Sequence, residues 1–335
     1  MGPGIESRSK WPRKKPDLVP ASLTLYMRWT FALLLACAAA VAQDDVVFRS
    51  GVALVHVDAE VTNAEGTILT GLTKDDFRVL DERKEQPVVH FSAEEEPLDL
   101  ILLFDISGSM RAVVEGVAAA AQEGLRELRQ GDRVSVMVFN TQARVVSQFT
   151  EDLDSVNRSI QDDVLGLRFG GGTYIQQAVD DAALRFLHEK RSQRRRAVLI
   201  ITDNIGQRTR REESVVRDFW EADAILSGLI VRNPTYQALH TVGVIMGPQR
   251  LALEAGMKGI AQKTGGDTVN SGDPGTAFRD AMHRIRTRYG LYYGLPQAKP
   301  GTTRTIHVEL TPEAARRYPK SRVRARTGYV VPGPA

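Results

Sequence analysis

Residues 98–109 read Leu-Asp-Leu-Ile-Leu-Leu-Phe-Asp-Ile-Ser-Gly-Ser. The first seven residues form a nearly continuous apolar run, typical of a strand that is buried on both faces of a parallel sheet. The run ends at Asp105, and Ser107 and Ser109 follow at alternate positions. Ligands of doubly wound folds bind beyond the carboxyl ends of the strands, so we expect this turn to lie at a binding site.

The chain downstream of this strand alternates between strand and helix patterns. Further strands are expected over 134–139, 144–149, 197–202, 228–231 and 268–269, and helices over 110–129, 152–165, 174–190, 212–226, 251–263 and 277–286. The strand at 144–149 follows its predecessor too closely for a crossover helix, so it should be antiparallel. Residues 98–287 are therefore predicted to form an α/β domain, with a doubly wound, mostly parallel sheet and one antiparallel edge strand.

Both flanks of this domain have β patterns. Residues 43–97 predict strands at 52–62, 67–72, 77–80 and 87–91, and residues 288–335 predict strands at 289–295, 305–310 and 322–331. The three C-terminal segments are too few for a sheet sandwich of their own. We therefore expect the C-terminal segment to complete the N-terminal one, which gives a β module split between the two ends of the chain.

Residues 1–42 are interpreted as an N-terminal extension and signal peptide. The apolar run of residues 31–42 is too short to span a bilayer, Arg28 precedes it, and Ala40-Val41-Ala42 has the form of a cleavage site. Cleavage after Ala42 predicts a secreted or periplasmic, cell-envelope protein, and translation can start at Met1 or at Met27. An alternative uses Cys37 at the end of Leu34-Leu35-Ala36-Cys37, where lipidation would tether the chain to a membrane.

Composition excludes several classes of function. The chain has 335 residues, a formal net charge of +3 and one cysteine, so a disulfide framework and a thiolate metal site are excluded. Its basic clusters are short and contain no interleaved aromatic residues, which argues against nucleic acid as a partner.

Two more loops carry side chains of the same chemistry as the first turn. Thr173 follows a run of three glycines at residues 170–172, and Asp203 follows the strand at 197–202. Together with Asp105, Ser107 and Ser109 they offer two carboxylates and three hydroxyls, the oxygen ligands that Mg²⁺ and Mn²⁺ prefer. Neutral hydroxyls leave the charge of the cation incompletely neutralised, so a coordination position is expected to accept an external carboxylate.

Asp105-x-Ser-x-Ser, Thr173 and Asp203 resemble the metal-ion-dependent adhesion site of von Willebrand factor A domains. The resemblance implies that Ser107, Ser109 and Thr173 contact the metal and that the two aspartates act largely through water. Asn204 departs from the glycine usual at its position, but asparagine tolerates the left-handed backbone. The flanks resemble the secreted, acidobacterial-type VWFA-related proteins over residues 46–331, through the segments at 48–51, 71–77 and 326–329.

The sequence therefore predicts an exported binding or adhesion module, not an enzyme, with a protein ligand that presents a carboxylate. One alternative is a scaffold or assembly subunit of a cell-envelope complex. Another is a metal-dependent hydrolase, for which no general base is available beyond Asp105 and Asp203 and no Gly-x-Ser-x-Gly motif is present. The serines could also simply cap the helix that follows them.

Overall fold

A six-stranded sheet forms the centre of the α/β domain. The computed structural model describes residues 53–93, 96–189, 194–207, 209–231 and 255–333. The strand order is β10-β9-β8-β5-β6-β7, and only the β6–β7 pair is antiparallel. The strands are β5 (Leu98–Asp105), β6 (Arg133–Phe139), β7 (Ala143–Thr150), β8 (Arg195–Thr202), β9 (Ala224–Val231) and β10 (Thr268–Ser271). This topology confirms the predicted doubly wound sheet with one antiparallel edge strand.

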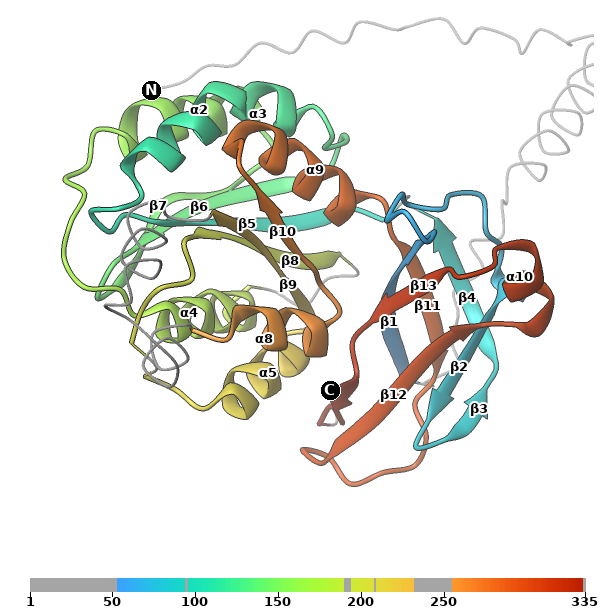
Figure 1. Cartoon of the computed structure of the whole chain (residues 1–335). Coiled ribbons are helices and arrows are strands. Elements are labelled where there is room, and N and C mark those ends of the chain that lie inside the picture. The colour runs from blue at the N-terminus through green and yellow to red at the C-terminus, as the bar shows by residue number, and fades with distance from the viewer. Residues whose placement is uncertain (1–52, 94–95, 190–193, 208, 232–254, 334–335) are drawn as a thin grey trace, which may run out of the picture. The chain divides into compact units, whose positions relative to one another are not determined.

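Helices cover both faces of this sheet (Figure 1). One face packs on α2 (Arg111–Leu125), α3 (Leu153–Arg158), the π-helical turn Ser159–Val164 and α9 (Pro274–Arg286). The other face packs on α4 (Ile175–Leu187), α5 (Glu212–Glu221) and α8 (Met257–Thr264). Successive side chains of β5 enter the two cores in turn, because residues alternate across a strand.

The β module consists of two four-stranded sheets, and each draws on both ends of the chain. The first has the order β13-β1-β11-β4 and the second β14-β12-β2-β3. The strands are β1 (Leu54–Thr62), β2 (Phe77–Asp81), β3 (Lys84–Gln86), β4 (Val88–Ala93), β11 (Tyr289–Gly294), β12 (Thr303–Leu310), β13 (Arg322–Ala325) and β14 (Gly328–Val330). Short helical turns lie at Lys74–Asp76 and at α10 (Pro312–Arg317). The split β module is thus confirmed as part of the fold.

Two segments of the β module differ from the sequence prediction. Residues 67–72 make only a single bridge, between Ile68 and Thr62, because the Tyr289 hydroxyl binds the Leu69 carbonyl at 2.8 Å and the Leu72 amide at 3.2 Å. The predicted strand at 322–331 is two strands in different sheets, since the Thr327 amide donates to the Lys263 carbonyl and bends the chain between them. β3 and α10 were not predicted.

Helix boundaries in the α/β domain differ as well. The helix expected over 212–226 ends at Glu221, and β9 starts at Ala224, earlier than the expected 228. Apolar residues around this boundary fit a helix or a strand, and pairing of β9 with β8 decides in favour of the strand. The helix expected over 251–263 starts at Met257, after Gly256 in a left-handed conformation, and residues 251–254 lie outside the described residues.

The sheet topology places the ends of β5 and β8 side by side. From β5 the chain moves to β6 on one side, and it later returns to β8 on the other side. Such a switch in strand order opens a crevice at the carboxyl ends of the strands. The proposed signal peptide, Met27, Cys37 and the segment at 48–51 lie outside the described residues. Within the part of the chain that is described, no helix has the length and apolar character needed to cross a membrane.

Candidate functional site

Asp105 is the last residue of β5, and its side chain is fully buried. One carboxylate oxygen accepts the Ser107 amide at 2.9 Å, and the other accepts the Thr202 hydroxyl at 2.8 Å. Burial raises the pKa of Asp105 to about 6, although the hydrogen bonds from Ser107 and Thr202 oppose the rise. Asp105 therefore fixes the start of the turn and ties it to the end of β8.

Ser107, Ser109 and Asp203 come together beyond these strand ends. The Ser109 hydroxyl donates to Asp203 Oδ2 at 2.8 Å, and the Ser107 and Ser109 hydroxyl oxygens lie 3.4 Å apart. Ser107 is buried and Ser109 is exposed, so the group has an inner and an outer side. The backbone of the turn is held at both ends, because the Ile106 amide donates to Phe139 and the Met110 amide to Ser107.

Thr173 joins this group through its backbone. Its carbonyl accepts the Gln207 amide at 3.1 Å, which places the start of α4 beside the loop that begins at Asp203. The glycine loop before it is fastened to the first turn by a hydrogen bond from the Gly170 amide to the Ile106 carbonyl at 2.9 Å.

Thr202 and Asn140 support the site and were not predicted, and Asn204 was considered only for its backbone conformation. Thr202 binds Asp105 and also accepts the Asn204 amide at 3.1 Å. Asn204 has a φ of 60°, the left-handed conformation expected from its sequence position, and its side chain accepts the Met257 amide at 3.4 Å. Asn140, after β6, donates to the Gly170 carbonyl at 3.2 Å. Thr202 and Asn140 each lie at a strand end, which is the signal that could have found them.

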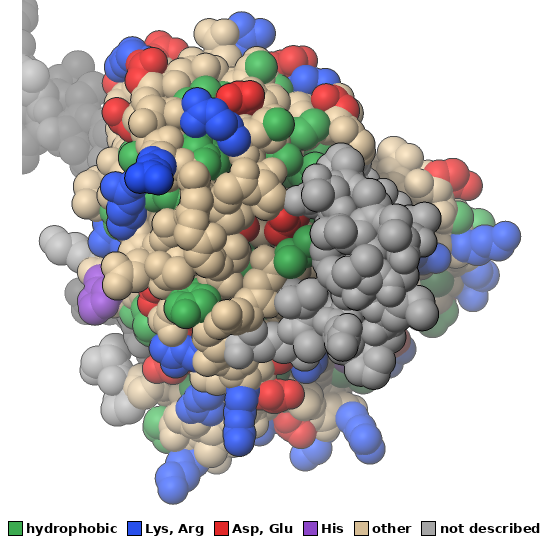
Figure 2. Space-filling model, turned by 60° about the vertical axis from the view of Figure 1, so that its left-hand side comes forward, with side chains coloured by type: hydrophobic (Ala, Val, Ile, Leu, Met, Phe, Trp, Pro, Cys, Tyr) green, Lys and Arg blue, Asp and Glu red, His purple; other side chains and the backbone are tan. Residues whose placement is uncertain are grey.

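The side chains at these strand ends offer hydroxyl and carboxylate oxygens as possible ligands. Figure 2 turns the side of the molecule with the strand carboxyl ends toward the viewer, and acidic side chains are visible in a recess near its centre. Among the described residues, no group of three or more His, Cys, Asp or Glu side chains could hold a metal ion. A cation at this position would depend on the serine and threonine hydroxyls together with two carboxylates, which suits a hard cation.

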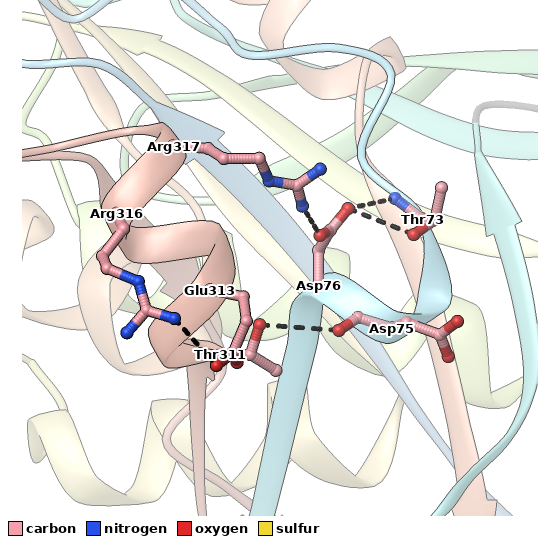
Figure 3. Close-up of a pocket in the computed structure, with 7 residues that line it drawn as sticks. All are labelled: Thr73, Asp75, Asp76, Thr311, Glu313, Arg316 and Arg317. Atoms are coloured by element: carbon pink, nitrogen blue, oxygen red, sulfur yellow. Dashed lines mark hydrogen bonds and ion pairs between the residues drawn. The ribbon is translucent and has the colours of Figure 1, made fainter.

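A pocket of about 650 Å³ lies elsewhere, in the β module between the turn at Lys74–Asp76 and α10 (Figure 3). Its charged side chains are largely paired with one another. Asp76 accepts from the Thr73 amide and hydroxyl and is paired with Arg317, and Arg316 pairs with Glu313 at 3.0 Å. The pair of Arg317 and Asp76 fastens α10 to the turn, so we interpret the pocket as a structural contact and not as a candidate binding site.

Comparison with known families identifies the segment that carries the strand-end residues. Residues 100–207 match the family model described as the von Willebrand factor type A domain. This range includes Asp105, Ser107, Ser109, Thr173 and Asp203. No curated protein matches the chain in sequence. The narrower resemblance to the acidobacterial-type subfamily stays a prediction.

Several solved structures are similar to this chain. BatB, a conserved hypothetical protein from Bacteroides thetaiotaomicron, is 21% identical, with 56% of this chain and 97% of that chain covered and a TM-score of 0.43. A von Willebrand factor type A protein from Catenulispora acidiphila is 10% identical, with 85% of this chain and 76% of that chain covered and a TM-score of 0.44. The vWF domain of the type V pili tip protein Mfa5 from Porphyromonas gingivalis is 17% identical, with 33% of this chain and 39% of that chain covered and a TM-score of 0.29. Likenesses of this size do not inform on function.

Proposed function

Because residues 100–207 match the family model of the von Willebrand factor type A domain, we propose that this protein is an exported binding module that holds a divalent cation and binds an acidic group of a protein partner. The coarser part of this statement, a module for protein interaction or adhesion, follows from the family. The cation, the acidic ligand and the export are our proposals. Export is supported by the sequence of residues 1–42.

The observation that carries the proposal is the meeting of Ser107, Ser109 and Asp203 at the ends of adjacent strands. The Ser109 hydroxyl lies 2.8 Å from the Asp203 carboxylate, which is 94 residues away in sequence, and 3.4 Å from the Ser107 hydroxyl. A helix cap needs one such side chain, so the additional carboxylate from the second loop supports a site for a cation.

The residues present fit Mg²⁺ or Mn²⁺. Ser107, Ser109 and Thr173 would hold the cation with their hydroxyls, and Asp105 and Asp203 would supply negative charge. When bound, the cation would supply a positive charge and a coordination position for a carboxylate of the partner. The chain itself orients the donors: Thr202 and the Ser107 amide hold Asp105, and the Gln207 amide holds the backbone of Thr173.

We propose binding and not hydrolysis, because both carboxylates of the group are already engaged. Asp105 accepts two hydrogen bonds and is buried, and Asp203 accepts from Ser109 and from the Ile205 amide at 3.0 Å. A hydrolase needs a further group that can accept a proton from water.

The proposal is tested by capture of partner proteins from an envelope fraction on the immobilised protein. Capture in the presence of Mg²⁺ should be lost on addition of a chelator and in the variants Ser109→Ala and Thr173→Ala. Ser214→Ala, at an exposed position on α5, is the matched control and should capture as the unchanged protein does.

Capture that is unaffected by the chelator and by both site variants would refute the proposal. The source of the captured protein separates the two roles considered for the site. A subunit captured from the envelope fraction indicates a scaffold role, whereas a protein captured only from extracts of foreign surfaces indicates adhesion.

A further inference from the structure

The segment that follows Asp203 is fastened to α4 by one arginine. The Arg210 amide donates to Gln176 Oε1 at 3.1 Å, and its Nε donates to Gln177 Oε1 at 2.9 Å. Its Nη2 lies 3.1 Å from Asp180 Oδ2. Arg210 therefore contacts three residues on the first two turns of a single helix.

The carboxylate that receives Arg210 is unusually placed. Asp180 is 1% exposed, and neither of its carboxylate oxygens accepts a conventional hydrogen bond from the described residues. Burial raises the pKa of Asp180 to about 7, and the neighbouring carboxyl group of Asp218, on α5, adds to the rise. A nearby negative charge favours the protonated form of a buried carboxyl group.

The segment that follows Asp203 is also attached to α4 through Gln176 and Ala255. Gln176 accepts the Arg210 amide with its oxygen and donates with its nitrogen to the Ala255 carbonyl at 3.2 Å. The Ala255 amide in turn donates to the Asn204 carbonyl at 3.1 Å. Gln176 thus links both flanks of the loop that begins at Asp203.

These contacts connect two of the proposed cation ligands. Thr173 directly precedes α4, and Asp203 directly precedes the segment that Arg210 fastens to α4. The Thr173 carbonyl and the Gln207 amide form a further link between helix and segment. A weaker hold on this segment would therefore let Asp203 move relative to Thr173.

We propose that Arg210 is a positioning residue for the cation site, and that the Asp180–Asp218 pair makes its hold on the segment depend on pH. The inference rests on the proposed function, because it assumes that Thr173 and Asp203 act together on a cation. Neither member of the pair touches a proposed ligand, so the effect is transmitted through Arg210.

The sign of the pH effect follows from the charges around Asp180. It faces Asp218 from α5, Arg210 from the segment and Asp181 from its own helix. Above pH 7 its carboxylate is ionised and attracts the Arg210 guanidinium. As the pH falls, Asp180 takes up a proton, the attraction to the Arg210 guanidinium weakens and the segment is held less firmly. The affinity for the cation should fall with it.

The test is calorimetric titration with Mg²⁺ at pH 6 and pH 8. We expect Arg210→Ala to weaken binding about tenfold at pH 8, the size typical of residues that orient metal ligands. Arg210→Lys should restore part of the loss, because it keeps the charge but not the Nε contact. Arg211→Ala, at the exposed neighbouring position, is the matched control and should bind normally.

The two carboxyl groups should give opposite results on substitution. Asp218→Asn removes the competing charge, so Asp180 stays ionised to lower pH and the affinity at pH 6 should approach that at pH 8. Asp180→Asn removes the partner of Arg210, so it should weaken binding at pH 8. An Arg210→Ala variant with unchanged affinity, or an Asp218→Asn variant with unchanged pH dependence, would overturn the inference.

Hydrogen exchange without metal separates this inference from the proposed function. Arg210→Ala should accelerate amide exchange in residues 203–211, whereas Arg211→Ala should not. If the unchanged protein binds no Mg²⁺ at either pH, the proposed function fails, while the exchange result still shows whether Arg210 holds the segment. If Mg²⁺ binds and Arg210→Ala changes neither exchange nor affinity, only the inference on Arg210 fails.

Discussion

Asp105 is a residue at which stability and the proposed binding oppose each other. Its carboxylate is buried at the end of β5, and burial raises its pKa to about 6, above the value of 3.8 for the free side chain. An acid with a raised pKa in the folded state is costly to keep ionised, and the ionised form reduces stability at neutral pH. A cation bound nearby would offset this cost.

Replacement of Asp105 by asparagine should therefore have two effects. We expect Asp105→Asn to stabilise the metal-free protein at pH 7 by about 1–3 kcal/mol, because the buried charge is removed, the amide oxygen can still accept the Ser107 amide, and the amide nitrogen can donate to the Thr202 hydroxyl oxygen. The stabilisation by added Mg²⁺ should be lost. Urea denaturation with and without Mg²⁺ measures both. A variant that is still stabilised by Mg²⁺ would contradict the assignment.

Among the individual site residues, those that share one loop were predicted best from the sequence. The Asp105-x-Ser-x-Ser spacing fixes three side chains of the group, because alternate residues of one turn can point the same way. Thr202 was missed as the partner of Asp105, since this contact depends on the register of β5 against β8. That register is set by packing over both faces of the sheet and not by any local pattern.

At the scale of elements, the contact between α8 and β9 leaves no room for a side chain. Gly266 follows α8, and a Cβ atom there would lie 1.9 Å from the Leu226 carbonyl oxygen. That carbonyl belongs to β9, the neighbour of β8 in the sheet. A glycine is required because the backbones approach closely.

We expect Gly266→Ala to lower the free energy of unfolding by about 1–3 kcal/mol, the usual cost of overpacking. Gly272→Ala is the matched control, since a Cβ atom at that position meets nothing within 4 Å. Urea denaturation of the two variants gives the comparison. Equal stabilities would show that α8 can move away from β9 without cost.

Elements were predicted best where the apolar pattern allows one interpretation. The buried strands β5 and β8 have long apolar runs, and the antiparallel β7 follows from the short connection before it. The predicted boundary between α5 and β9 was wrong, because the apolar residues around 222–226 suit either a helix or a strand. Only pairing with β8, which lies far away in sequence, resolves such a segment.

At the scale of the whole described unit, a group of charged side chains, of which Asp223 is exposed, joins the β module to the α/β domain. His56, on β1, lies with Nδ1 3.4 Å from Asp223 Oδ2, and Arg326 donates to Asp223 at 2.7 Å. His56 also stacks on Tyr292, with ring centroids 4.7 Å apart. Burial alone would lower the pKa of His56, but the charges of Asp58 and Asp223 outweigh it, so the pKa is raised.

A histidine with a raised pKa contributes stability below its ordinary pKa, and the contribution is lost as the pH rises through the folded value. We therefore expect His56→Gln to destabilise the protein more at pH 6 than at pH 8.5. Urea denaturation at both values measures the difference, and His307→Gln, at an exposed position, is the control. A loss that is equal at the two pH values would show that His56 acts by packing alone.

The split of the β module could be predicted, because three C-terminal strands are too few for a sandwich. The charged contacts between the β module and the α/β domain could not be predicted from the sequence. Arg195 binds Asp58 across 137 residues of sequence, at 2.7 Å and with both side chains buried. Nothing in the local pattern of either residue distinguishes it from an exposed charge, so only the assembled fold identifies the pair.

Binding of a divalent cation by Asp105, Ser107, Ser109, Thr173 and Asp203 can be measured by calorimetric titration of the purified protein with Mg²⁺. Ser109→Ala is the site variant because Ser109 is exposed. We predict saturable binding to the unchanged protein and to Ser214→Ala, and none to Ser109→Ala. Equal heats from Ser109→Ala and the unchanged protein, or no binding to either, would contradict the claim.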